Sequence, residues 1–190
     1  ETYIADINVD MPIFNEFIDK KCLKHISTLL DDLTFNLVAV ELHIQNPGCS
    51  PIPHHQDNFY HCVEPNKSLK LLVPLDELNE HSGGLIFLDT LINYPVLDHK
   101  PSAVKNFSSY IPQNVIRKLS FKETSYRYEL GDASFHFMNS IHFSKGNNST
   151  TAKTFVVYRF ESEKIKVNKE SVDKYNKCYE QHLKLMKINQ

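Results

Sequence analysis

Two side chains in the middle of the sequence, His55 and Asp57, are suited to binding one metal ion together. On an extended strand, residues two positions apart point to the same face, so an imidazole and a carboxylate can reach one ion without bending the backbone. With one distant histidine they would form a 2-His-1-carboxylate facial triad, which leaves coordination positions open for substrates and O2. A His-x-Asp tripeptide is expected by chance about 0.6 times in a chain of this composition, so the hypothesis depends on finding that histidine.

The third ligand should lie on a late strand, which is distant in sequence but comes close in space when a sheet rolls up. Two histidines compete for this role. His136 lies inside the alternating segment 133–138, between two phenylalanines, which favours a packed imidazole. His142 follows the break that ends this segment. The residue pattern alone leaves both open.

The elements that must position these residues are short strands bounded by turns, with a helical period before and after them. The sequence therefore predicts one domain over residues 1–190, mainly β with flanking helices, in a β-sandwich or barrel. We expect a helix over about 11–31, a β core over about 35–161 and a helix over about 169–188. Strands are predicted at 37–44, 84–88, 126–130, 133–138 and 154–160, with a compact apolar run at 68–75.

The stretch 89–120 has little periodicity and contains Pro95, Pro101 and Pro112. A long irregular segment in a compact domain is usually functional or mobile. We expect it to cover the pocket and to set substrate specificity, although it carries no motif that identifies a substrate.

The composition excludes several classes of function. The 190 residues are 41% hydrophobic and carry a formal net charge of −2, so no strong field is available to hold nucleic acid or an anionic membrane. No apolar run approaches the roughly 20 residues of a transmembrane helix, and no signal peptide opens the chain. The four cysteines form no CxxC pair and are expected to be free thiols, which favours a cytoplasmic protein. The chain begins at Glu1 rather than Met, which leaves open whether a segment precedes it.

Several motifs follow the pattern of one enzyme family. The second half contains Gly131-Asp132, His142-Phe143-Ser144, Asn147 and, eleven positions after His142, the basic residue Lys153. Together with the Pro-Gly pair ahead of the His-Gln-Asp tripeptide, these motifs resemble the phytanoyl-CoA dioxygenase family of Fe(II)- and 2-oxoglutarate-dependent oxygenases. The resemblance covers about residues 35–160. It implies a double-stranded β-helix, the cupin-like jelly roll.

The resemblance also implies the chemistry. Fe(II), 2-oxoglutarate and O2 would be the cofactors, with ascorbate where a reductant is needed. A small-molecule substrate would be hydroxylated while 2-oxoglutarate is decarboxylated to succinate and CO2. The protein would act as a monomer or a homodimer. The implied residues are the metal ligands His55, Asp57 and His142, then Lys153 and Ser144 for 2-oxoglutarate, with Arg159 as the alternative to Lys153. Asp57 favours hydroxylation, because related halogenases replace this carboxylate with a small residue.

Two departures from the family pattern keep a second function open. Lys153 stands where the family usually has arginine, and it offers one charge-assisted contact rather than a fork. The segment 89–91 replaces the family's Pro-Gly-Ser-His motif. The alternative is a cupin-like jelly roll that binds a metal or ligand without oxygenase turnover, for which a basic residue facing the metal would serve no purpose. Asn58, Tyr60 and His61 are further candidates for lining the pocket.

Overall fold

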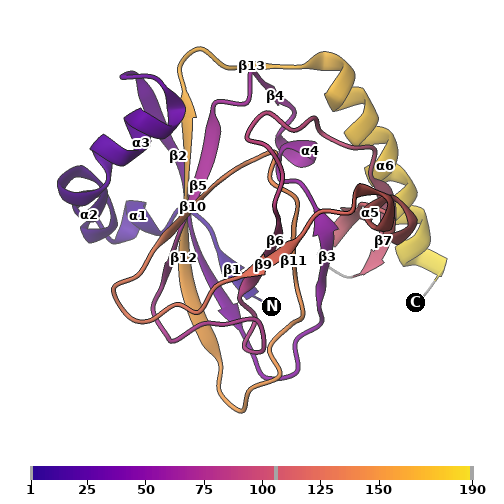
Figure 1. Ribbon diagram of the computed structural model, residues 1–190, viewed down its shortest axis with the longest axis horizontal. Coiled ribbons are helices and arrows are strands. Elements are labelled where there is room, and N and C mark those ends of the chain that lie inside the picture. The colour runs from indigo at the N-terminus through magenta and orange to yellow at the C-terminus, as the bar shows by residue number, and fades with distance from the viewer. Residues whose placement is uncertain (1, 105–106, 189–190) are drawn as a thin grey trace.

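The computed structural model describes residues 2–104 and 107–188 and is built on two antiparallel sheets (Figure 1). The larger sheet contains, in spatial order, β1 (Thr2–Ile4), β2 (Phe35–Gln45), β12 (Lys153–Ser162), β5 (Ser68–Pro74) and β10 (Ser134–Phe137). The smaller sheet contains β3 (Ile52–His55), β11 (His142–Ser144), β6 (Leu85–Leu88) and β9 (Glu123–Ser125). The chain passes repeatedly from one sheet to the other, from β2 to β3, β5 to β6, β10 to β11 and β11 to β12. This is the double-stranded β-helix, so the expected fold class is confirmed.

The stretch 89–120 is more regular than its sequence suggests. It holds a hairpin of β7 (Lys100–Val104) and β8 (Phe107–Tyr110), followed by α5 (Gln113–Leu119). The C-terminal α6 (Lys169–Ile188) runs along this hairpin (Figure 1). A short α4 (Asn58–His61) follows β3, and β4 (Val63–Glu64) pairs with β13 (Lys166–Val167). No helix in the described part of the chain is long and apolar enough to cross a membrane.

The helix expected over 11–31 is interrupted. The structure has α1 (Ile7–Asp10), α2 (Ile13–Lys21) and α3 (Leu23–Leu30). The last two are separated at Cys22, whose φ of −108° departs from the ideal helical value while its ψ of −22° stays in the right-handed helical region. Ile18, Cys22, Ile26 and Leu30 are all buried, at a constant spacing of one per turn. The apolar period therefore continues through the break, which is why the sequence predicts one helix, while the bend lets both pieces lie on the twisted sheet.

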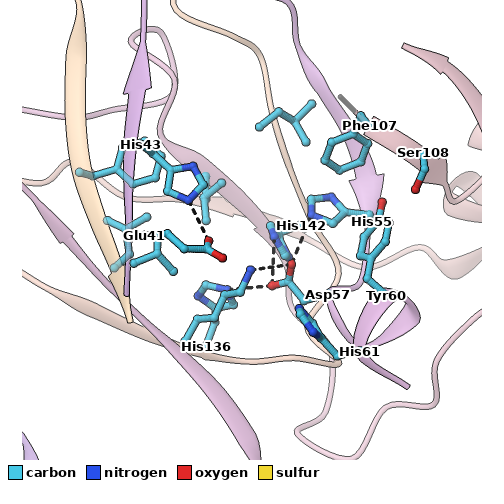
Figure 2. Close-up of a pocket in the computed structure, with 16 residues that line it drawn as sticks. Glu41, His43, His55, Asp57, Tyr60, His61, Phe107, Ser108, His136 and His142 are labelled. Atoms are coloured by element: carbon cyan, nitrogen blue, oxygen red, sulfur yellow. Dashed lines mark hydrogen bonds and ion pairs between the residues drawn. The ribbon is translucent and has the colours of Figure 1, made fainter. Parts of the chain in front are cut away.

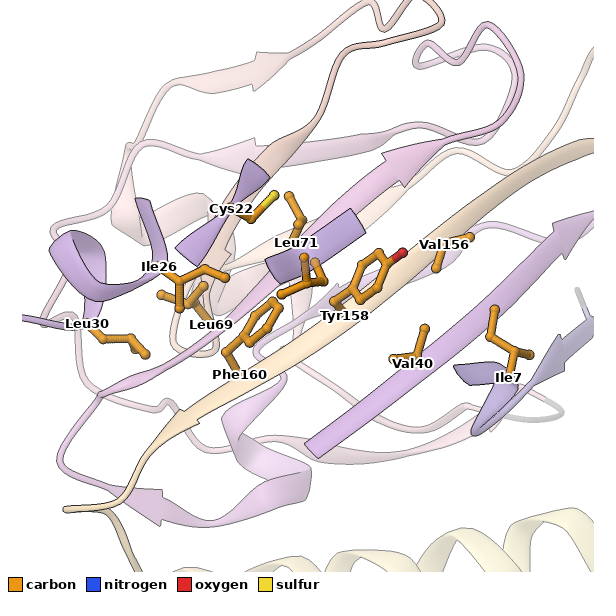
Figure 3. Close-up of a cluster of buried hydrophobic side chains, with 11 residues drawn as sticks. Ile7, Cys22, Ile26, Leu30, Val40, Leu69, Leu71, Val156, Tyr158 and Phe160 are labelled. Carbon is orange, nitrogen blue, oxygen red and sulfur yellow. The ribbon is translucent and has the colours of Figure 1, made fainter. Parts of the chain in front are cut away.

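The main core lies between these helices and the outer face of the larger sheet. Leu69 and Leu71 of β5 and Val156, Tyr158 and Phe160 of β12 point outward under the helices (Figure 3). Because side chains alternate across a strand, the residues between them point inward, into the barrel. The same two strands thus supply both the core and the wall of the cavity described below.

The prediction of a strand at 126–130 is wrong. The strand β9 ends at Ser125, and the segment after it makes only a single bridge, between Tyr128 and Leu78. Tyr128 is buried in a second apolar cluster with Leu72 and Leu85, at one end of the barrel. The alternating pattern reflects this one buried tyrosine between exposed neighbours rather than a paired strand.

Candidate metal centre

The junction between β3 and α4 positions His55 and Asp57. The strand ends at His55, and Asp57 is the N-cap of α4 with helical dihedral angles, φ −57° and ψ −35°. The two side chains therefore do not share a face of an extended strand, as the sequence suggests. They converge because the chain turns from strand into helix between them, and this turn brings His55 Nε2 to 3.8 Å from Asp57 Oδ1.

His142 completes a group of three potential ligands (Figure 2). It begins β11, where it lies directly opposite His55 in the antiparallel register. Its Nε2 is 3.8 Å from Asp57 Oδ2. The ligand atoms of His55, Asp57 and His142 all lie within 4.8 Å of one another, and all three residues are buried. The three residues predicted to bind the metal are thus brought together.

Hydrogen bonds to the backbone orient both imidazoles. His55 Nδ1 is 2.9 Å from the carbonyl oxygen of Pro53, and His142 Nδ1 is 3.0 Å from that of Ser140. A carbonyl oxygen only accepts, so each Nδ1 must carry the proton and donate it. Each Nε2 then has a free lone pair directed at the group. This is the arrangement in which metal-binding histidines are commonly held.

The electrostatics of the group favour the protonation states that a metal requires. Burial lowers the pKa of His142 to about 4 and, with the charge of His142, holds that of His55 well below its ordinary value. Burial would raise the pKa of Asp57, but Lys70 and His142 outweigh it and hold this pKa well below its usual range. Asp57 Oδ2 is buried and accepts no hydrogen bond within the described residues. Two neutral imidazoles and a carboxylate with an unpartnered oxygen fit a divalent metal ion.

Two further residues contact Asp57. His136 Nε2, from β10, lies 3.4 Å from Asp57 Oδ2, and neither ring nitrogen of His136 has a hydrogen-bond partner in the described chain. Lys70 Nζ, from β5, donates to Asp57 Oδ1 at 2.9 Å. Lys70 is not among the site residues predicted from the sequence. The available signal was a lone charged residue inside the apolar run 68–75, at an inward position of a buried strand.

A cavity of about 330 Å³ opens on this group. Its wall has a polar part around Asp57 and Lys70 and an apolar part that includes Leu72, Leu85 and Phe155. Tyr60 and His61 line it, as expected, but Asn58 does not. Asn58 instead bonds both backbone groups of Val63 and the side chain of Asn139. The other lining residues are Glu41, His43, Ile52, His55, Asp57, Lys70, Leu72, Leu85, Phe107, Ser108, His136, His142, Phe155 and Val157.

The stretch 89–120 covers this cavity from two sides. Gln56, which is fully buried, donates to the carbonyl of Pro95 at 2.9 Å and accepts from the backbone N–H of Leu97 at 2.8 Å. Phe107 packs its ring edge-on against His55, with centroids 4.7 Å apart. Tyr60 donates its hydroxyl to the carbonyl of Ser109 at 3.0 Å, which ties β8 to α4. The expected position over the pocket agrees with the structure, and the role in specificity stays a prediction.

The residues predicted to hold 2-oxoglutarate do not line this cavity. Ser144 Oγ donates to the carbonyl of Gly83 at 3.1 Å, so its hydroxyl is committed to the backbone. Lys153 is the first residue of β12, paired in register with Gln45, beyond Phe155 as seen from the metal group. Arg159 lies further along the same strand, opposite Lys70 of β5, where Nη1 contacts His61 Nδ1 and lies 3.4 Å from Glu161 Oε1.

Comparisons with known proteins identify the fold. Neither family models nor curated proteins match this chain. EctD from S. alaskensis, solved with 2-oxoglutarate and 5-hydroxyectoine, has a TM-score of 0.71 at 15% identity, covering 84% of this chain and 56% of that chain. The epimerase SnoN, solved with Fe3+, alpha ketoglutarate and nogalamycin RO, has a TM-score of 0.70 at 13% identity. The match covers 87% of this chain and 65% of SnoN. EvdO2 from Micromonospora carbonacea var. aurantiaca has a TM-score of 0.67 at 20% identity, and the match covers 85% of this chain and 66% of EvdO2. The chain thus spans 56–66% of the length of these proteins.

Proposed function

We propose that this chain is an Fe(II)- and 2-oxoglutarate-dependent oxygenase that acts on a small molecule. The observation that carries the proposal is the convergence of His55, Asp57 and His142 within 4.8 Å at the wall of a jelly-roll cavity. The neighbouring folds support it, because SnoN was solved with Fe3+ and alpha ketoglutarate and EctD was solved with 2-oxoglutarate. Membership of the phytanoyl-CoA dioxygenase family, hydroxylation as the outcome and a cytoplasmic location belong to the same proposal.

His55, Asp57 and His142 would hold the iron on one face. When bound, Fe(II) with 2-oxoglutarate supplies the O2 activation that drives substrate oxidation and yields succinate and CO2. The chain contributes position: the carbonyls of Pro53 and Ser140 hold each imidazole in the required tautomer. Phe107 and Tyr60 border the ligand face and restrict the access of water to it.

The cavity suits a small molecule. Its volume of about 330 Å³ is at the lower end of the range of ligand sites. The apolar part, formed by Leu72, Leu85, Phe155 and Val157, can take a carbon chain, and the polar part near Lys70 can fix its orientation. Lys153, Ser144 and Arg159 remain candidates for holding 2-oxoglutarate. For Lys153 this requires that its side chain reach past the ring of Phe155.

Two measurements test the proposal. Fe(II), 2-oxoglutarate and air are added to the protein, succinate is quantified, and metal content is measured separately. The wild type should release succinate, and His142→Ala should lose both metal binding and succinate release. His54→Ala is the matched control, because His54 adjoins the triad but stacks on Phe143 at 4.1 Å and lies outside the ligand group. Succinate release by His142→Ala at the wild-type rate would refute the assignment.

A metal-binding jelly roll without turnover is the second candidate. It is favoured by one observation, that neither Ser144 nor Lys153 faces the cavity. In that case the wild type would bind a divalent metal through His55, Asp57 and His142, yet release no succinate with 2-oxoglutarate. The two measurements therefore separate the candidates.

A further inference from the structure

Among the described residues, Lys70 is the only lysine on the cavity wall, and its position is unusual. It lies in β5 with Leu69 and Leu71, both fully buried, on either side. Its side chain is 18% exposed, and its ammonium contacts Asp57 Oδ1 at 2.9 Å. Burying a lysine costs stability unless a partner or ligand compensates it. Asp57 is that partner as long as no metal ion shares its carboxylate.

A bound metal ion would change this balance. The ion adds two positive charges next to Asp57, which then serves both the ion and Lys70. Two other carboxylates on this side are already engaged, since Glu41 Oε2 lies 3.2 Å from His43 Nε2 and Glu161 Oε1 lies 3.4 Å from Arg159 Nη1. Arg159 is directly opposite Lys70 in the register of β5 and β12, and its charge is balanced by Glu161. The loaded site would thus carry an excess of positive charge beside an open coordination face.

We propose that Lys70 and the metal ion together form a two-point anion site that takes a carboxylate. This inference rests on the proposed function. Any group that accepts a hydrogen bond from Lys70 near its present position is adjacent to the ligand group, because Asp57 Oδ1 is only 3.8 Å from His55 Nε2. The carboxylate can come from 2-oxoglutarate or from the substrate that is oxidised. Charge complementarity is the same in both cases, and the experiment below distinguishes them.

The competing reading is purely structural. Glu41 also lines the cavity and is close enough to Lys70 for the lysine to contribute to lowering the pKa of Glu41. If Lys70 turned to Glu41 when the metal binds, it would hold no ligand. Replacing Lys70 would then leave carboxylate binding unchanged.

The experiment uses the whole chain loaded with Co(II), whose visible absorption reports on coordination without turnover. Lys70→Met removes the ammonium and keeps most of the stem, and Lys70→Gln repeats the test with a polar side chain. Lys70→Arg retains the charge, and Lys118→Met on exposed α5 is the control for general charge loss. Circular dichroism verifies that each variant folds. Co(II) is titrated first, then 2-oxoglutarate, then acetate into the complex with 2-oxoglutarate.

If the proposal is correct, removing the Lys70 ammonium strengthens metal binding and weakens carboxylate binding. Removing a competing cation should tighten Co(II) binding by Lys70→Met about tenfold or more. Binding of 2-oxoglutarate to Co(II)-loaded Lys70→Met should weaken about ten- to a hundredfold, which is the scale of a charge-assisted hydrogen bond. Lys70→Arg keeps the charge and should recover part of the lost affinity for 2-oxoglutarate. That result assigns the carboxylate to 2-oxoglutarate. If 2-oxoglutarate binding is unchanged but acetate perturbs the wild-type spectrum and not that of Lys70→Met, the carboxylate belongs to the substrate.

Other results overturn the proposal. Equal binding of 2-oxoglutarate and acetate by wild type and Lys70→Met would mean that Lys70 holds neither. Weaker Co(II) binding by Lys70→Met would show that Lys70 supports the metal site instead of competing for it. If the wild type binds Co(II) and 2-oxoglutarate normally, either result refutes this inference alone. If the wild type binds no Co(II), the proposed function falls as well.

Discussion

The two faces of β12 and β5 differ in what they do for the molecule. Outward residues such as Val156, Tyr158 and Phe160 pack under α2 and α3 in an apolar core. Inward residues of the same strands include Lys70 and Arg159, which lie beside the group that contains Asp57. One strand pair therefore carries a stabilising face and a face whose charges require compensation.

The distribution of unpartnered polar atoms sharpens this difference. Among the described residues, the buried side-chain atoms without a hydrogen bond include Asp57 Oδ2, both ring nitrogens of His136 and Arg159 Nε. The helix-covered core contributes none of them. Each such atom costs about 1–3 kcal/mol when it stays unpartnered. A fold tolerates this cost where a ligand can compensate it, and the opposite face supplies the stability that makes it tolerable.

Phe160→Ala should produce the largest change on the stabilising face. The side chain is fully buried, so its removal should lower the free energy of unfolding by about 3–5 kcal/mol. Urea denaturation measures the loss, and Co(II) affinity of the folded variant should stay at the wild-type value. Phe155→Ala is the matched variant on the inward face, where the same truncation should also change the affinity for 2-oxoglutarate. A changed Co(II) affinity in Phe160→Ala would show that the faces are not separable.

A fall in pH should destabilise the cavity side of the molecule first, because the histidines with lowered pKa values lie there. Burial lowers the pKa of His99 to about 4, and the ring accepts from the backbone N–H of Gln56 at 3.1 Å. Its unfolded pKa is about 6.5, so below that pH the unfolded chain binds more protons than the folded one. Stability is therefore present above about pH 6.5 and is lost as the pH falls toward 4, by about 3 kcal/mol for this histidine.

Urea denaturation at pH 7 and pH 4.5 measures this loss. His99→Gln keeps an acceptor for Gln56 without titrating, so its stability should vary less between the two pH values than that of the wild type. Phe160→Ala is the control from the other face and should retain the wild-type pH dependence. An equal pH dependence in His99→Gln and wild type would contradict the assignment to His99.

The smallest effect is expected at the end of α3, on the helix-covered side. Asp31 follows α3 in the left-handed conformation with φ of 48°, which glycine adopts at no steric cost. Asp31→Gly should raise the free energy of unfolding by about 0.5 kcal/mol, after allowing for its exposed ion pair with Lys67. Thermal denaturation measures the gain, and metal binding should not change. A loss of stability would indicate that the ion pair outweighs the backbone strain.

Local patterns in the sequence predicted a large part of this structure. Alternation identified 37–44 as a strand, and 154–160 was also predicted to be one; these correspond to β2 and β12. The types of His55, Asp57 and His142, with the family resemblance, selected the three residues that the structure brings together. Strand pattern and ligand type are properties of short segments, so they can be read without knowing what each segment packs against.

Tertiary structure decided what depends on packing and register. The break at Cys22 preserves the helical period, and the 126–130 alternation needs only one buried tyrosine, so neither outcome is visible in a local pattern. Both His136 and His142 lie near Asp57, but only the pairing of β11 with β3 places His142 opposite His55. Lys70 contacts Asp57 across 13 residues of sequence because β5 enters the barrel beside α4. Side-chain type and spacing are encoded locally, whereas the distance between segments is set by how the two sheets close on each other.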